Sequence, residues 1–408
     1  MRKYLVTLHR WFGLTMAVFL FIAGLTGAVI SWDHELDEWL NPALFHANNK
    51  GIAQAPLTLA NKLEQEQPGW MVNYVPLTIE PGHTLGMSVS ARPDPATGKA
   101  SKLDFNQIAL NPVTGEIQGQ REWGAVSLSR ENLLPFLYKL HYSMHIPDAW
   151  GLELGILFMG IIAIIWVFDN LIALWISFPN YKSWRKSFAF RWQQGGYKLN
   201  FDLHRSGGVW VWLLLLMLAI TSVSMNLNFQ VMRPVVEVFS TLSPSPFASR
   251  APQPEDTPLA PGITREKILD IARAEAQRRG WNAPAGAVFY SPEFGLYGVG
   301  FFEAGNDHGD GGLGNPWLYF DGKDGSPAGE NIPGTGSAGD IFMQAQFPLH
   351  SGRIIGLPGR ILVSLMGAVV AMLSITGIVI WLRKRQSRRV DQKVRNSSRV
   401  NPLQTNAS

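Results

Sequence analysis

Four histidines stand in matched positions beside long apolar runs, and their type and spacing suit metal ligation. Two lie in a repeated tripeptide, Leu8-His9-Arg10 and Leu203-His204-Arg205, with a glycine a few residues later in each case. The other two, His141 and His350, each follow a leucine just ahead of another apolar run. Neutral imidazole is a frequent ligand of transition metals, and histidine is costly to bury in a membrane without a partner. The pattern predicts two pairs of metal ligands.

The apolar runs are long enough to cross a membrane as helices, because about 20 apolar residues span a hydrocarbon core of about 30 Å. Three runs contain no charged side chain and a fourth contains only Asp169: residues 11–32, 206–230, 361–382 and 154–178. The first run has a basic start, as a signal peptide would, but it is too long and lacks a small-x-small cleavage site. We therefore predict four transmembrane helices, the first of them an uncleaved anchor.

Lysine and arginine gather on one side of the predicted membrane. They crowd residues 179–203, between the second and third apolar runs, and the tail that begins at Arg383. Because cytoplasmic segments carry the excess of basic residues, both termini are predicted to be cytoplasmic and the two long polar segments to lie outside, which in a bacterial cell means the periplasm. The net charge of +4 reflects this topology, so no nucleic-acid partner is predicted.

Each polar segment shows a helix followed by short strands. In the first, residues 57–67 favour a helix, and the strands are expected at residues 71–79, 85–91, 103–110 and 116–120, with an Asn-Pro-Val-Thr-Gly turn before the last. In the second, residues 264–279 favour a helix with Thr264 as N-cap, followed by strands at 287–290, 296–303 and 318–320 around a glycine-rich loop, 305–314. The repeated order predicts an internal parallel duplication.

The predicted fold class is a membrane protein with an α-helical four-span bundle and two periplasmic α+β domains. Its parts are expected at residues 1–32 (first transmembrane helix), 33–148 (first periplasmic domain), 149–178 (second helix), 179–203 (basic cytoplasmic loop), 204–230 (third helix), 231–355 (second periplasmic domain), 356–382 (fourth helix) and 383–408 (basic disordered cytoplasmic tail).

This topology places His9 and His204 near the cytoplasmic face, and His141 and His350 near the outer face. Histidine is an axial ligand of b-type haem, and the absence of cysteine excludes thiolate-ligated haem and iron–sulfur clusters. We therefore predict two b-type haems, one near each face. Basic side chains beside the ligands are expected to neutralise the haem propionates, Arg10 and Arg205 inside, Arg353 and Arg360 outside. Alternatively, these residues only contact lipid headgroups.

His145 is an alternative outer ligand, because it lies on the same helical face as His141 if that stretch is helical. His141 is preferred because its Leu-His context matches Leu349-His350. The remaining histidines lack paired spacing and are interpreted as solvated surface residues: His34, His46, His83 and His308. Asp307-His308-x-Asp310 is interpreted as a polar turn rather than a metal site, and Asp169 as an interfacial acid rather than a proton relay.

Several motifs resemble one known family over nearly the whole chain, up to about Arg385. They are Leu-His-Arg-Trp-x-Gly at residues 8–13, the second Leu-His-Arg, Phe-Pro-Leu-His-Ser-Gly-Arg at 347–353 and Gly-Leu-Pro-Gly-Arg at 356–360. These motifs resemble the PepSY-associated transmembrane family. The polar segments are similar to PepSY modules, most clearly at Asn-Pro-x-Thr-Gly-Glu, residues 111–116.

The resemblance implies a bacterial inner-membrane protein associated with iron uptake, because the family includes a ferric-siderophore reductase of the FoxB type with two b-type haems. By motif, His9 and His204 would be the inner ligands, and His141 and His350 the outer ones. The expected partners are membrane lipid, a ferric siderophore as substrate, and a separate cytoplasmic or quinol electron donor, because no dinucleotide fingerprint is evident. The rivals are a non-redox PepSY binding or regulatory protein, and haem electron transfer to another periplasmic acceptor.

Overall fold

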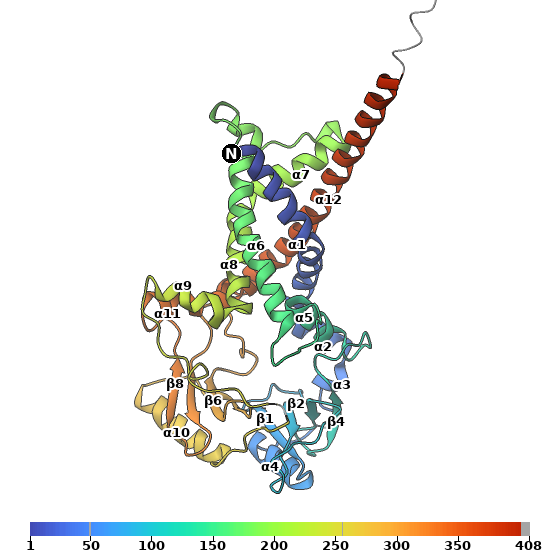
Figure 1. Ribbon diagram of the computed structural model, residues 1–408. Helices are drawn as coiled ribbons and strands as arrows, with labels where there is room; N and C mark the ends of the chain where they lie inside the picture. The colour runs from blue at the N-terminus through green and yellow to red at the C-terminus, as the bar shows by residue number, and fades with distance from the viewer. Residues whose placement is uncertain (49, 255, 401–408) are drawn as a thin grey trace, which may run out of the picture. The chain divides into compact units, whose positions relative to one another are not determined.

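A computed structural model describes residues 1–48, 50–254 and 256–400, without the side chains of residues 181 and 393–400. The chain divides into two compact units. The first, here called the helical unit, comprises residues 1–28, 140–226 and 363–408. The second, the sheet unit, comprises residues 29–139 and 227–362. Elements are numbered as in Figure 1.

The helical unit is built from long apolar helices. Its elements, some of which continue into the sheet unit, are α1 (Arg2–Ile30), α5 (Leu133–Ser143), α6 (Leu154–Ser177), η1 (Tyr181–Ser187), η2 (Trp192–Gln194), α7 (Gly196–Trp210), α8 (Trp212–Asn226) and α12 (Leu357–Val400). One core joins four of them through Leu20 of α1, Ile162 of α6, Leu218 of α8 and Val370 of α12. Helices α1, α6 and α12 are each long and apolar enough to cross a membrane.

The predicted third span is not one straight helix. Helices α7 and α8 meet at Val211 with a bend of 72°, and they amount to a fourth span only if the bent pair is taken together. The pair Gly207-Gly208 lies one turn before the break, where the absence of side chains lowers helix propensity. The sequence had predicted His204 at the start of a span. The structure places it well inside α7 instead.

Two glycines allow α1 and α12 to approach closely. A Cβ atom on Gly24 would stand 2.6 Å from the carbonyl oxygen of Gly367, and one on Gly367 would stand 3.0 Å from the Cβ atom of Ala28. Small residues at such a crossing let two backbones pack directly against each other within a membrane.

The tail also differs from the expectation of disorder after about Arg385. Helix α12 continues to Val400. Its last turns are rich in Arg, Lys and Gln, which favour a helix, and neither glycine nor proline interrupts them. The final part of the predicted tail, residues 401–408, lies outside the described residues.

The sheet unit contains one antiparallel sheet of eight strands in the order β4-β3-β2-β1-β5-β6-β7-β8. The strands are β1 (Trp70–Pro76), β2 (Leu85–Ala91), β3 (Gln107–Leu110), β4 (Ile117–Arg121), β5 (Ala285–Ser291), β6 (Leu296–Phe301), β7 (Trp317–Asp321) and β8 (Pro327–Asn331). The helices of the unit are α2 (Asp33–Leu40), α3 (Pro42–Phe45), α4 (Pro56–Glu66), η3 (Asn228–Met232), α9 (Arg233–Glu237), α10 (Arg265–Arg278), α11 (Ala338–Ser351) and η4 (Arg353–Ile355).

The two polar segments were predicted as separate domains, but the structure joins them through β1 and β5. The register pairs Tyr74 with Phe289, Val75 with Val288 and Pro76 with Ala287. Without this pairing, each strand would leave an unpaired edge of backbone N–H and C=O groups. The two segments therefore share one sheet. The sequence also missed β8, whose Pro, Gly, Glu and Asn residues have low strand propensity.

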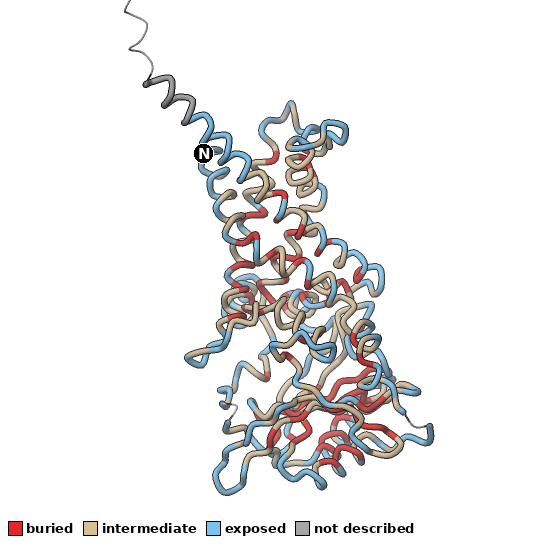
Figure 2. Tube along the Cα trace, turned by 90° about the vertical axis from the view of Figure 1, so that its right-hand side faces the viewer, coloured by how far each residue is buried: buried red, intermediate tan, exposed pale blue. Residues whose placement is uncertain are grey.

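Helices α4 and α10 pack against this sheet and close its core (Figure 1). Leu59 of α4 and Ile268 of α10 are among its most buried side chains, and the buried residues of the unit concentrate in this layer (Figure 2). Arg265 of α10 joins the two helices, because its guanidinium donates to Glu64 of α4 at 3.2 Å and to the carbonyl of Val72 at 2.9 Å. The predicted N-cap is confirmed, since the hydroxyl of Thr264 accepts from the N–H of Lys267.

Candidate functional site

His9 and His204, from α1 and α7, lie together in the helical unit. Their ring centroids are 6.0 Å apart and the rings are tilted by 46°. Both rings line a cavity of about 440 Å³. The sequence-predicted inner pair is therefore brought together, on two helices that are far apart in the chain.

Asp169 of α6 holds the ring of His9. Its carboxylate accepts a hydrogen bond of 2.8 Å from Nδ1 of His9, and the residue is only 5% exposed. A carboxylate that accepts from one ring nitrogen fixes the tautomer and leaves the lone pair on the other. Asp169 was interpreted as an interfacial acid, and its role as the partner of His9 is a correction. The signal in the sequence that could have revealed this role is that Asp169 is the only acidic residue within a predicted span.

His204 is held by α12 instead. Its Nδ1 donates to the carbonyl of Leu373 at 3.0 Å and to the hydroxyl of Thr376 at 3.2 Å. The hydroxyl itself donates to the carbonyl of Met372 in its own helix, so its oxygen is left to accept from the ring. Gly377 follows, and a Cβ atom there would stand 3.0 Å from Cε1 of His204. Hydrogen bonds thus fix the ring, and the absence of a side chain at Gly377 leaves room for it.

His141 has the same surroundings on α1. Its Nδ1 donates to the carbonyl of Ala23 at 2.9 Å and to the hydroxyl of Thr26 at 3.1 Å. A Cβ atom on Gly27 would stand 2.8 Å from its Cε1 atom. A carbonyl, a threonine three residues later and then a glycine therefore hold each of two histidines, and both rings carry their proton on Nδ1.

The remaining candidate ligands lie elsewhere. Helix α5 ends at Ser143, and His145 follows with a positive φ of 52°. It therefore does not share a helical face with His141, as the sequence had suggested it could. His350 lies in the last turn of α11, in the sheet unit, whereas the other three predicted ligands lie in the helical unit.

Arg10 and Arg205 also line the cavity of the helical unit. In each, Nε is buried and has no hydrogen-bond partner among the residues that the structure describes. The lining carries five basic side chains and one acidic one, Asp169. Buried guanidinium nitrogen atoms with an unmet donor, in a basic cavity, are suited to an anionic ligand.

Arg353 and Arg360 are already paired with carboxylates of the sheet unit. Arg353 bonds Asp310 at 2.6 Å, and Arg360 bonds Glu35 at 2.7 Å and stands over the Trp32 ring. Burial raises the pKa of Glu35, but the hydrogen bond and the charge of Arg360, together with a backbone hydrogen bond, leave the pKa below its usual value. Any propionate would therefore compete with these carboxylates.

A second cavity, of about 480 Å³, lies within the sheet unit. Arg353 and Arg360 line it together with Tyr74 and with Asp307 of the glycine-rich loop. Burial raises the pKa of the Tyr74 phenol, which is neutral at physiological pH. Asp307 bonds its neighbour His308 at 2.7 Å, as expected for a polar turn.

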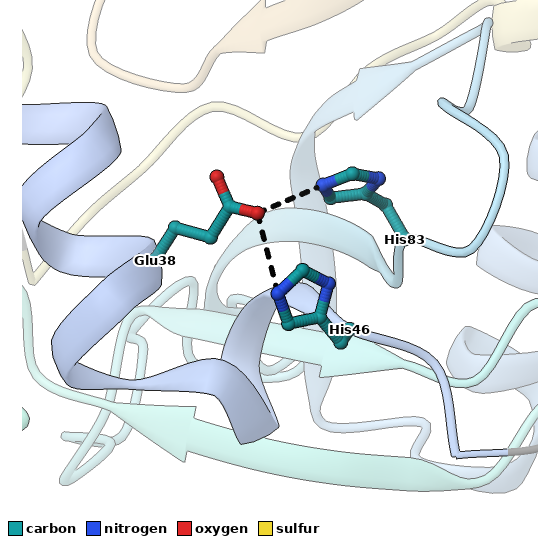
Figure 3. A group of neighbouring side chains, drawn as sticks. All are labelled: Glu38, His46 and His83. Carbon is teal, nitrogen blue, oxygen red and sulfur yellow. Dashed lines mark hydrogen bonds and ion pairs between the residues drawn. The ribbon is translucent and has the colours of Figure 1, made fainter.

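Glu38, His46 and His83 form a cluster that sequence reasoning missed (Figure 3). The carboxylate of Glu38 lies 3.3 Å from Nε2 of each histidine. His46 and His83 were interpreted as solvated surface histidines without a paired partner; His46 is exposed, but the two rings lie together beside Glu38, so the expectation that they are unrelated is corrected. Their separation along the chain hides the cluster, and only the folded strands bring them together.

A comparison with curated proteins gives no match. One family model, described as the PepSY-associated TM region, matches residues 6–384, which include most of both compact units. Three helices are in addition long and apolar enough to cross a membrane. The family resemblance is therefore confirmed, and this membrane protein belongs to the PepSY-associated TM region family.

Proposed function

We propose that this protein is a di-haem electron-transfer protein that reduces a ferric siderophore outside the bacterial inner membrane. The observation that carries the proposal is the pair His9 and His204, whose rings face one cavity with Nδ1 of each tied to an acceptor. Neither ring makes a hydrogen bond through Nε2 among the described residues. Each ring can therefore offer the Nε2 lone pair to a metal.

The donor set fits haem. The ring centroids of His9 and His204 are 6.0 Å apart, so the two imidazoles would hold the haem iron between them. The unmet Nε atoms of Arg10 and Arg205 suit the propionates. A volume of about 440 Å³ lies in the range of sites for small molecules and cofactors.

A bis-histidine haem would supply one-electron transfer. The protein itself fixes the orientation of the ligand side chains and surrounds the charged site. Asp169 fixes the ring of His9, and Leu373 and Thr376 fix that of His204. Apolar side chains of four helices exclude water from the core of the unit. Fixed ligands and a dry surrounding limit reorganisation when the charge changes.

For the second haem we retain the sequence-based ligand His141, while His350 stays a prediction from the sequence. The support for His141 is its surroundings, because Ala23, Thr26 and Gly27 hold its ring as α12 holds that of His204. His145 is the weaker candidate, since it lies beyond the end of α5.

The proposal includes the topology. We propose four spans, with the bent pair of α7 and α8 as the third, both termini cytoplasmic, and a parallel duplication of the two halves. The order of one helix and four strands, found twice in the sheet unit, supports the duplication.

Electrons would come from a separate donor, a quinol or a reduced flavin, and one electron would convert each bound Fe(III) to Fe(II). Oxygen chelators that suit Fe(III) hold the softer Fe(II) less well, so the iron is released. We propose the cavity of the sheet unit as the site of the chelate, because charged side chains such as Arg353 and Asp310 line it and its volume is suitable.

Stopped-flow reoxidation tests the acceptor. The dithionite-reduced protein should be reoxidised faster by an anaerobic ferric siderophore than in buffer. The matched control is the same siderophore loaded with Ga(III), which cannot be reduced under these conditions and should leave the protein reduced. Equal reoxidation rates in buffer and with the ferric complex would contradict siderophore reduction. Electron transfer to another acceptor would then be the remaining proposal.

A further inference from the structure

Glu38, His46 and His83 come from three separate segments of the sheet unit (Figure 3). Glu38 belongs to α2, His46 follows α3, and His83 precedes β2. Two imidazoles and one carboxylate are a donor set typical of transition-metal sites with open coordination positions. Nothing in the proposed haem chemistry uses these residues.

The backbone places both imidazoles on one side. His46 and His83 are directly opposite each other in an antiparallel bridge. The N–H of Thr84 donates to the carbonyl of Phe45 at 2.8 Å, and the N–H of Ala47 to that of Gly82 at 2.9 Å. Because residues opposite each other in such a pair project to the same face, the two rings approach, with centroids 5.2 Å apart.

Helix α2 holds the carboxylate in place. The residue before Glu38, Asp37, is buried and accepts from Arg121 at 2.7 Å and from Asn41 at 2.8 Å. This anchor fixes the end of α2 against the strand that carries Arg121. The third donor is therefore preorganised by its neighbours, as a metal site requires.

The distances favour a shared ion over direct hydrogen bonds. Charge-assisted N–H···O bonds are about 2.7–2.9 Å long, whereas Glu38 lies 3.3 Å from Nε2 of both rings. Donor atoms about 2.0–2.1 Å from a tetrahedral metal lie about 3.3 Å from one another. We propose that Glu38, His46 and His83 bind a divalent first-row transition metal ion.

The site is open to exchange. The side chain of His46 is 52% exposed, and three protein donors leave at least one coordination position for water. His83 also lines the cavity that we propose for the chelate. An ion released there would have an imidazole of this cluster within the same cavity. A role in receiving Fe(II) rests on the proposed function, whereas metal binding does not.

Cobalt titration tests the site on the full-length protein in detergent, after treatment with a chelator. Wild type should bind Co(II) with d–d absorption that reports imidazole ligation, and Zn(II) should displace it. His46→Gln, His83→Gln and Glu38→Gln should each weaken Co(II) binding by at least about 10- to 100-fold, the loss that even outer-shell changes cause.

His308→Gln is the matched control, because it removes a histidine of the same unit that, among the residues the structure describes, bonds only Asp307. It should bind Co(II) as wild type does. Zn(II) should also raise the melting temperature of wild type and His308→Gln, but not that of the three site variants. Equal Co(II) affinity in wild type and His46→Gln would overturn the proposal, as would an equal loss in His308→Gln. Neither readout involves haem, so failure here is distinct from failure of the reductase proposal.

Discussion

The two histidine clusters differ in which ring nitrogen the protein occupies. In the helical unit, Nδ1 of His9 and of His204 is tied to a fixed acceptor, so the structure presets the tautomer and the ring orientation. In the sheet unit, Nε2 of His46 and of His83 faces one carboxylate, and Nδ1 of His83 is buried without a partner among the described residues. The first arrangement suits a permanently held cofactor, and the second an ion that exchanges.

Loss of an inner ligand should have the largest effect. His204→Ala removes one of the two imidazoles that face the cavity, so haem per chain should fall by about half. Pyridine haemochrome quantification of the purified protein measures this. His308→Ala, which alters a histidine of the sheet unit, should keep the full content. Unchanged haem in His204→Ala would remove His204 from the ligand set.

A change in the hydrogen bonds behind the ligand should have a smaller effect. Thr376→Val deletes one of two acceptors of Nδ1 of His204 while the carbonyl of Leu373 remains. Haem retention should weaken by about 10-fold, at the lower end of outer-shell effects. Transfer of haem to an apo-haem-binding protein reports it. Thr15→Val is the control, because within the described part of the chain the hydroxyl of Thr15 bonds only the carbonyl of Trp11.

The two units should respond separately to a core mutation. Ile268 is fully buried under the sheet, and Ile268→Ala should cost about 2–5 kcal/mol of sheet-unit stability through lost burial and a cavity. Thermal unfolding followed by circular dichroism checks this. The haem spectrum at low temperature should stay that of wild type. Loss of the inner haem in the folded variant would show that the two clusters are not independent.

Acid should weaken the sheet unit slightly through Asp321. The hydrogen bond from Arg250, at 2.5 Å, lowers the pKa of this carboxyl in the folded state. Its contribution is therefore present above the unfolded pKa of about 3.9 and is lost as pH falls through the folded pKa. Arg250→Met should lower stability at pH 7 by less than about 1 kcal/mol. The difference from wild type should vanish in strong acid, and a constant difference at all pH values would refute this cause.

The sequence predicted what depends on local pattern. The apolar runs indicated α1, α6 and α12, and the repeated Leu-His-Arg indicated that His9 and His204 would share a site. A helical period or a run of apolar residues can be recognised in the sequence because a single stretch of chain determines it.

What the sequence could not predict depends on contacts between distant segments. The pairing of β1 with β5 joins two strands that are far apart in the sequence, and no local pattern in either strand indicates its partner. His46 and His83 meet only because their backbones pair. The Thr-Gly pairs that hold His141 and His204 were visible as residues, but their role appears only when helices pack against each other.

The central claim is that histidines of the helical unit ligate haem. The most direct measurement is the absorption spectrum of the protein purified from haem-replete cells, before and after dithionite, beside the double variant His9→Ala/His204→Ala. We predict a Soret band that shifts on reduction in wild type, with about two haems per chain, and about one in the double variant. A wild type without a Soret band, or a double variant that keeps all its haem, would contradict it.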